Sequence, residues 1–282
     1  MVTVNTEPPI TSIPAAAELD VPRDIVAVSE SHSAAGKTDW HSHPRGQLLY
    51  AEKGTITTTA EEGTWVAPPD RALWMPAHLP HVTAHSVGTE LRMVFISSDV
   101  ESRLPARCAV VQMSPLLREI FLAVGRLPRL YDESGADGRL VRVFLDQLAP
   151  LPAEALHLPM PDNNKLRSIA KRILEQPERT LVVDEAASEV AMSPRTFARH
   201  FLADTELTWG VWQRQAKMLR ALELLGAGKG VGEVAIWLGY ESPSAFIAAF
   251  RKNFGTTPAR YFNAENADKV SSENRVSTRE VH

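Results

Sequence analysis

The spacing of apolar residues along the chain changes character near residue 114. Before that point, from about Ile25 to Ser98, short apolar runs are separated by Gly, Pro and acidic turns. Gln47–Ala51 and Leu91–Ile96 are typical, and such runs recur roughly every 8–12 residues. This pattern predicts a β-sandwich or a small β-barrel.

From Ser114 onward the apolar period becomes helical. Ser114 followed by Pro115 is a typical helix start and predicts a helix over 116–124. A second predicted helix, 138–148, carries its apolar residues on one stripe. The two helices can either close the β-barrel or form a dimer interface, because an amphipathic stripe packs against whatever apolar surface is available.

A proline-rich segment at 149–162 follows these helices and is expected to be a flexible linker, since prolines cannot continue a helix. Beyond residue 163 the helical period predicts helices at 165–175, 183–190, 193–201, 208–225, 231–238 and 242–250. We therefore expect a multi-domain α+β protein, with a β-barrel and two following helices and then an all-α domain. The predicted divisions are a disordered leader at 1–22, a barrel domain at 23–148, the linker at 149–162, a helical domain at 163–262 and a polar tail at 263–282.

The predicted helical domain contains one sequence motif twice. Ser193–Phe201 returns as Ser242–Phe250, and each copy has a Ser-Pro helix start and two Phe residues four positions apart. Residues four apart share a helix face, so the Phe pairs are expected to point inward. A short helix with a small inward residue, Ala187 or Ala235, precedes each copy. This arrangement predicts two helix-turn-helix units, in which the second helix enters the major groove of DNA.

The residues expected to face DNA lie on the outer side of each second helix. They are Ser193, Arg195, Thr196 and Arg199 in the first copy, and Ser242, Ser244, Ala245, Ala248, Arg251 and Lys252 in the second. The predicted helix 208–225 joins the copies and spans about 27 Å. That length is close to the ~34 Å repeat of the major groove, so one chain is expected to enter two successive turns of a double-stranded DNA operator.

Residues 163–262 resemble the DNA-binding domain of AraC/XylS-type transcriptional regulators. The resemblance rests on the stretch from Val231 to Phe246 and on Phe250–Tyr261, which are close to the signature of that family. It implies a seven-helix domain with two recognition helices and, as in many relatives, dimerisation through the first domain. The alternative is that the two units form a helical protein–protein module.

One position departs from that family. Arg199 keeps an arginine that the family often has in both copies, whereas the second copy has Ala248 there. We therefore expect polar base readout mainly from the first copy. The second copy is expected to contact thymine methyl groups, with phosphate contacts from Arg251 and Lys252.

A cluster of histidines marks the predicted barrel. His41 and His43 are two positions apart, which places both imidazoles on one face of a strand, and Gln47 and His81 follow. This spacing resembles the two cupin motifs, in which His-x-His, a Glu and a later His converge on one divalent metal inside a small β-barrel. The resemblance implies a cupin-like sensor domain. Gln47 takes the Glu position, and His78 takes a position usually given to Gly.

Two interpretations of His41, His43, Gln47 and His81 stay open. Neutral imidazoles suit a transition metal such as zinc, nickel or iron, with the amide oxygen of Gln47 as a weak fourth donor. Alternatively, the four side chains line a pocket for a small-molecule effector, since regulators of this family commonly bind one without metal. The neighbouring large aromatic residues are expected in the barrel core, and they are Trp40, Tyr50, Trp65 and Trp74.

Charge and cysteine content further limit the kinds of partner and site that this protein can have. The net charge is −4, but residues 165–262 hold 14 Lys or Arg against 10 Asp or Glu, which suits a polyanionic partner. Cys108 is the only cysteine, so an intrachain disulfide and a four-thiolate zinc site are excluded. No signal peptide and no apolar run long enough to span a membrane is evident, and we expect a cytoplasmic protein.

The sequence therefore predicts a sequence-specific DNA-binding transcriptional regulator without enzymatic activity. Its cupin-like domain is expected to sense a small molecule or a metal, and its partners are operator DNA, the effector and a second copy of the chain in a homodimer. The alternative is a cupin metal enzyme, a dioxygenase or isomerase, with an attached DNA-binding domain. Gln47 weakens that alternative because it removes a negative metal ligand.

Overall fold

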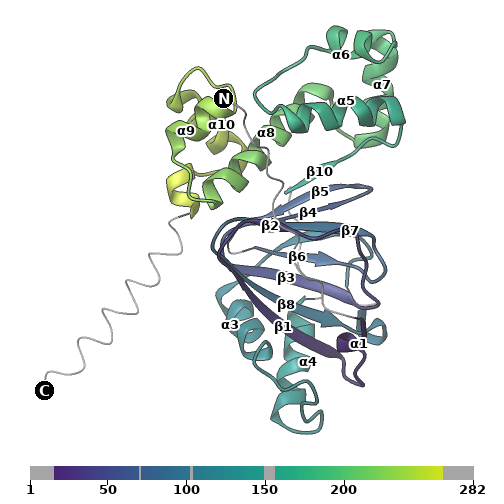
Figure 1. Cartoon of the computed structure of the whole chain (residues 1–282), viewed down its shortest axis with the longest axis vertical. Coiled ribbons are helices and arrows are strands. Elements are labelled where there is room, and N and C mark those ends of the chain that lie inside the picture. Colours follow the sequence, from purple (N-terminus) through teal and green to yellow (C-terminus); the bar gives the residue numbers. More distant parts are fainter. Residues whose placement is uncertain (1–15, 70, 102–103, 149–155, 263–282) are drawn as a thin grey trace, which may run out of the picture.

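The computed structural model describes residues 16–69, 71–101, 104–148 and 156–262. Within them, two five-stranded antiparallel sheets form a β domain, and a group of helices forms a helical domain next to it (Figure 1). This confirms the predicted fold class.

The two sheets place residues distant in sequence side by side. The first sheet has the order β1 (Ile25–His32), β8 (Thr89–Ile96), β3 (Gly46–Lys53), β6 (Arg71–Met75) and β9 (Ala109–Gln112). The second has the order β10 (His157–Pro159), β5 (Gly63–Ala67), β4 (Ile56–Ala60), β7 (His81–His85) and β2 (Gly36–Lys37). In β4, Ile56, Thr58 and Ala60 are buried while the residues between them are partly exposed. Such alternation is typical of a strand with one face on the core.

Helices α3 (Pro115–Val124) and α4 (Ala136–Leu148) cover the first sheet. The hydroxyl of Ser114 accepts a hydrogen bond from the Leu117 N–H at 3.2 Å, which caps α3 as predicted. The apolar stripes of both helices bury Phe121 and Phe144 together with Tyr50 of β3. Of the two roles that the sequence left open for these helices, the packing shows the first: their apolar stripes close the β domain.

The helical domain includes a helical segment at 258–262 and six longer helices close to the predicted spans. The longer helices are α5 (Asn164–Glu175), α6 (Val183–Glu189), α7 (Pro194–Thr205), α8 (Trp209–Gly226), α9 (Val231–Trp237) and α10 (Pro243–Phe254). A further short helix, α2 (Ser98–Glu101), follows β8 in the β domain. Figure 1 shows α6 and α7 at one end of α8 and α9 and α10 at the other, so that α8 joins two helix–turn–helix units.

The turns inside these two units correspond to each other at the level of single hydrogen bonds. Ala191, with φ 53°, and Gly239, with φ 73°, both have left-handed backbone conformations directly after the C-cap of the first helix. The next N–H in each unit donates back to a buried alanine carbonyl, Met192 to Ala187 and Tyr240 to Ala235, both at 2.9 Å. The first helix and turn thus repeat after 48 residues and the second helix after 49, so the second turn contains one extra residue.

The end of the predicted leader is part of the fold. Residues Ala16–Leu19 form the short helix α1, and Leu19 is fully buried. The Arg45 guanidinium donates to the carbonyl oxygens of Leu19, Val21 and Arg23 at 2.6–2.9 Å. The prediction of a disordered leader is therefore wrong from residue 16 onward, because a distant arginine satisfies the backbone there. Residues 1–15 and the predicted tail at 263–282 lie outside the described residues.

The end of the predicted linker is also structured. Residues His157–Pro159 form β10, which pairs with β5 in the register Leu158 to Thr64. The His157 ring stacks on Trp65, with centroids 4.4 Å apart. Pro159 is tolerated because it ends an edge strand. The linker prediction is wrong here, and residues 149–155 lie outside the described residues.

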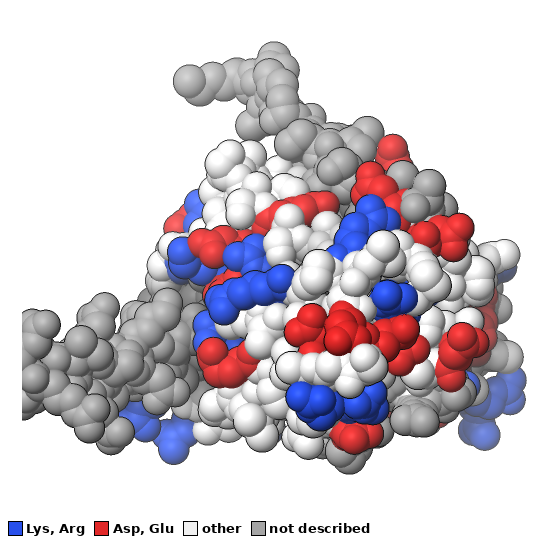
Figure 2. Space-filling model, turned by 90° about the horizontal axis from the view of Figure 1, so that it is seen from below, with Lys and Arg blue, Asp and Glu red and all other residues white. Residues whose placement is uncertain are grey.

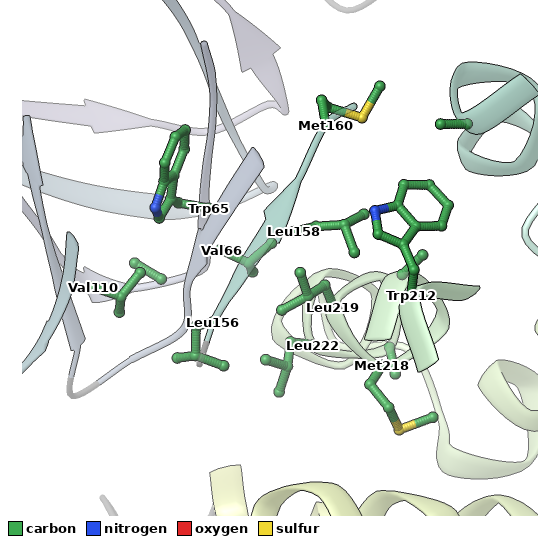
Figure 3. Packing of buried hydrophobic residues seen from close by; sticks show 14 of the residues in the cluster. Trp65, Val66, Val110, Leu156, Leu158, Met160, Trp212, Met218, Leu219 and Leu222 are labelled. Atoms are coloured by element: carbon green, nitrogen blue, oxygen red, sulfur yellow. The ribbon is translucent and has the colours of Figure 1, made fainter. Parts of the chain in front are cut away.

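Strand β10 attaches the helical domain to the β domain through α8. The Trp212 indole N–H donates to the Pro159 carbonyl at 2.7 Å. Leu158 lies between Val66 on the β-domain side and Trp212 on α8 (Figure 3). One buried apolar cluster therefore runs through both domains without a break.

The paired turns generate the first prediction. An alanine in the left-handed region costs about 1 kcal/mol relative to glycine, so Ala191→Gly should stabilise the chain slightly. Gly239→Ala should destabilise it by more than ~1 kcal/mol, because the added Cβ would also lie 2.8 Å from the Glu178 carbonyl oxygen. Denaturant unfolding of the two variants measures both effects. Equal and opposite changes would contradict the role given to the Glu178 contact.

Candidate DNA interface and histidine site

The outer face of α7 is held in place from behind by aromatic packing. Phe197 and Phe201 are fully buried, and both rings contact Trp209 of α8 edge-to-face at 5.3 and 5.0 Å. This fixes the rotation of α7 about its axis, and Arg195 and Arg199 consequently lie on its exposed side. Guanidinium groups on an exposed recognition helix can donate two hydrogen bonds to guanine.

The outer face of α10 is built in the same way but differs in chemistry. Phe246 and Phe250 are buried, while the outward positions are small and uncharged until the last turn of the helix. The exposed residues that the sequence assigned to DNA here are Ser244, Ala245, Ala248, Arg251 and Lys252. The two exposed faces are therefore unequal, with arginines along α7 and cations only at the end of α10.

Two residues predicted to contact DNA, Ser193 and Ser242, are helix N-caps. The Ser193 hydroxyl accepts from the Thr196 N–H at 3.2 Å and donates to the Thr196 hydroxyl at 2.8 Å. The Ser242 hydroxyl accepts from the Ala245 N–H at 3.1 Å. These contacts set where each second helix begins, so Ser193 and Ser242 have a structural role as caps.

The end of the β domain away from the helical domain has a different surface. Figure 2 views the molecule from that end, where basic and acidic side chains are intermixed over a largely uncharged surface. A face without one dominant sign of charge gives no general attraction to a polyanion. This end of the β domain therefore shows no basic patch that would suit DNA.

The histidine cluster forms at the start of β7. Residues His41 and His81 form an antiparallel bridge, each N–H donating to the carbonyl of the other at 3.0 and 2.8 Å. His43 follows two residues later along the same segment. The nitrogen ligand atoms of the three imidazoles all lie within 4.8 Å of one another. The structure thus brings together all three histidines that the sequence selected.

Backbone contacts orient two of these rings. The Nδ1 atoms of His41 and His81 lie 2.8 and 2.9 Å from the carbonyl oxygens of Asp39 and Leu79. Only an N–H can donate to a carbonyl, so both rings are assigned as the Nδ1–H tautomer. Each Nε2 then has a free lone pair, which is the state of a histidine poised to bind a metal.

Burial also favours the uncharged form of the three imidazoles in the cluster. Burial, together with charge repulsion from the neighbouring His41 and His81, lowers the pKa of His43 to about 3. Burial likewise lowers the pKa of His81 to about 4 and that of His41 below its ordinary value. All three imidazoles are therefore uncharged near neutral pH, as metal ligation requires.

The donor set fits a transition metal. The Nε2 atoms of His43 and His81 and the Oε1 atom of Gln47 are buried and make no hydrogen bond to the described part of the chain. Buried polar atoms of this kind ordinarily have a partner, and a metal or a polar ligand would provide one. Gln47 lies on β3 with its amide nitrogen donating to Met93 Sδ at 3.4 Å.

The structure confirms some of the other sequence expectations around the cluster and contradicts one. His78 has φ 62°, so the family's preference for Gly at its position reflects a left-handed backbone there. Tyr50, Trp65 and Trp74 are buried as predicted, but Trp40 is 60% exposed beside His41. The sequence did not indicate Phe95, whose ring packs edge-to-face on His43 at 5.0 Å, because it comes from a distant strand.

Comparison with family models matches both halves of the chain. A model described as an AraC-like ligand binding domain matches residues 26–151, and a helix-turn-helix domain model matches residues 186–264. Within the described residues, no helix is both long enough and apolar enough to cross a membrane.

Named relatives agree with these matches. The chain is 34% identical over 221 residues to the HTH-type transcriptional regulator NimR of Escherichia coli K12, covering 78% of this chain and 81% of that protein. It is 28% identical to RipA of Corynebacterium glutamicum over 122 residues, covering 43% of this chain and 35% of RipA.

Two kinds of solved structure are also similar. ToxT from Vibrio cholerae matches with a TM-score of 0.36 at 9% identity, over 85% of this chain and 98% of ToxT. The DNA-binding domain of AdpA in complex with a target DNA matches with a TM-score of 0.35 at 32% identity, over 38% of this chain and 96% of that domain. From the family models and the extent of the match to NimR, the chain belongs to the AraC family of transcriptional regulators, with an N-terminal ligand-binding domain and a C-terminal helix-turn-helix domain.

Proposed function

We propose that this regulator binds specific operator sequences through α7 and α10, and that a ligand of the β domain modulates this binding. The observation that carries the proposal is the pair of exposed second helices, each fixed by buried Phe residues and joined by the single helix α8. At about 1.5 Å per residue, the 18 residues of α8 span roughly 27 Å, which suits two successive major grooves on one side of a duplex.

The two helices are proposed to contribute unequally. Arg195 and Arg199 supply donors for base edges, so α7 carries most of the sequence readout. Ala245 and Ala248 on α10 offer only methyl groups, which suit thymine, while Arg251 and Lys252 suit phosphates. In this proposal the second unit positions the protein and the first unit selects the sequence.

For sensing, we propose that His41, His43 and His81 bind a divalent transition metal such as zinc, nickel or iron, with Gln47 as a further donor. The orphaned, buried Nε2 atoms and the low pKa values of His43 and His81 support this choice. When bound, such a metal would supply a Lewis-acidic position for an effector. The alternative is that the same side chains bind a small-molecule effector directly.

We further propose that the protein is a homodimer and not an enzyme. Leu116 on α3 and Val143 on α4 are 61% and 47% exposed, although the opposite faces of both helices are buried. A second copy would cover these residues. The named relatives are transcriptional regulators, which favours this proposal over a cupin dioxygenase or isomerase with an attached DNA-binding domain.

Arg199→Ala tests the readout. Operator DNA is first selected from a random library with the full chain, and affinity is then measured by fluorescence anisotropy. Arg199→Ala should lose about 1–3 kcal/mol of binding free energy on the selected site and should discriminate less between bases. Arg251→Ala should weaken binding to all DNA sequences alike and lower the salt dependence of that binding. Arg126→Ala in the β domain is the matched control. Undiminished affinity and discrimination for Arg199→Ala would refute the proposed role of α7.

The metal site is tested by metal analysis of the purified full chain. Wild type is expected to retain one transition-metal ion per chain after gel filtration in Zn²⁺ or Ni²⁺. His43→Ala and His81→Ala should bind at least tenfold more weakly, because each removes a buried ligand. His32→Ala, a histidine outside the cluster, is the control. Equal metal retention by wild type and His81→Ala would exclude this site.

A further inference from the structure

A second candidate ligand site lies between the two domains, away from the histidine cluster. A cavity of about 230 Å³ is bounded by β4 and β5 on one side and by α8 and the end of α5 on the other. Its walls therefore come from both domains. An apolar cavity of about 150 Å³ accommodates benzene, so this one fits a ligand of roughly ten non-hydrogen atoms.

One part of the cavity wall is apolar and another part is charged. Val66, Leu158, Ile173 and Leu219 provide the apolar part. Lys217, Arg220 and Glu223 of α8 provide the charged part, and they are joined by the hydroxyl groups of Thr57, Thr59 and Thr64. Two cationic side chains against one carboxylate leave this lining with an excess of positive charge.

The single carboxylate is already engaged. Glu223 Oε2 pairs with Arg220 Nη1 at 2.6 Å, and Glu223 Oε1 accepts from the Thr57 hydroxyl at 2.5 Å. The guanidinium of Arg220 has further N–H donors beyond the one used here. An incoming anion could therefore bind Arg220 beside Glu223 or displace it.

The second cation is less well compensated. Lys217 Nζ donates to the Glu178 carbonyl oxygen at 3.3 Å and lies 6.0 Å from the Tyr240 ring centroid. Burial lowers the pKa of Lys217, and the charge of Glu178 only partly opposes that effect. A half-buried ammonium with mainly neutral contacts gains stabilisation from an anion placed in the cavity.

We propose that this interdomain cavity binds a small organic carboxylate. The carboxylate pairs with Arg220 and Lys217, and an apolar body of about seven carbon atoms packs on Val66, Leu158 and Leu219. An inorganic dianion does not suit the site, because the apolar walls would desolvate it without supplying further donors.

Binding at this site would also act on the contact between the domains. A ligand carboxylate competes with Glu223 for Arg220, and Glu223 is the side chain that links α8 to Thr57 of β4. Occupancy therefore changes how firmly α8, and with it both second helices, is held on the β domain. This regulatory consequence, unlike the site itself, rests on the proposed DNA-binding function.

The test is titration of the full chain with phenylacetate, followed by calorimetry or by NMR, beside phenylacetamide as the uncharged control of equal size. Phenylacetate is expected to bind at least tenfold more tightly than phenylacetamide. Arg220→Gln should abolish this preference and Arg220→Lys should retain most of it. Ala216→Leu, which fills the cavity without changing a charge, should weaken the binding of both compounds. His81→Ala in the histidine cluster should change the affinity for neither.

Three results would overturn the proposal. They are equal binding of acid and amide, binding unaffected by Arg220→Gln, and no saturable binding of phenylacetate at millimolar concentration. Operator affinity of the same variants, measured without ligand, reports separately on the proposed function. A failure of DNA binding with intact phenylacetate binding would remove only the regulatory consequence.

Discussion

The docking of α8 onto β10 is the interaction on which the rest of this structure depends. Trp212 is fully buried, packs against Phe201 of the first helix-turn-helix unit, and donates its indole N–H to Pro159 of the strand attached to the β domain. One side chain thus belongs to the core of the DNA-reading unit and to the interface with the sensor domain. Because α8 also joins the two units, its position on the β domain sets the position of both second helices.

This arrangement offers a short physical connection between the histidine site and the helices. His81 begins β7, and β7, β4, β5 and β10 are consecutive strands of one sheet that ends at α8. The interdomain cavity lies on the same route, over β4 and β5. A ligand at either place can therefore bias the domain contact, provided that it binds the docked and undocked arrangements with different affinity.

The features that could be predicted from the sequence are those with local causes. Ser-Pro starts and Phe pairs four residues apart fix α7 and α10 within one stretch of chain. The His-x-His spacing correctly indicated that His41 and His43 lie together, but the strand expected there is only an isolated bridge at His41. The features that were missed depend on distant partners. The burial of Leu19 requires Arg45, and β10 requires the free edge of β5 and the indole of Trp212. In the described residues 156–162, the prolines correctly argued against a helix, but an edge strand tolerates them equally well.

Calorimetric unfolding of the full chain is the most direct test of the docked arrangement. The account predicts one cooperative transition for wild type, because a single buried cluster spans both domains. In Trp212→Phe, which keeps an aromatic ring but leaves the Pro159 carbonyl without its donor, the β domain and the helical domain should unfold in separate steps. Two separate transitions in wild type, unchanged by Trp212→Phe, would contradict the account.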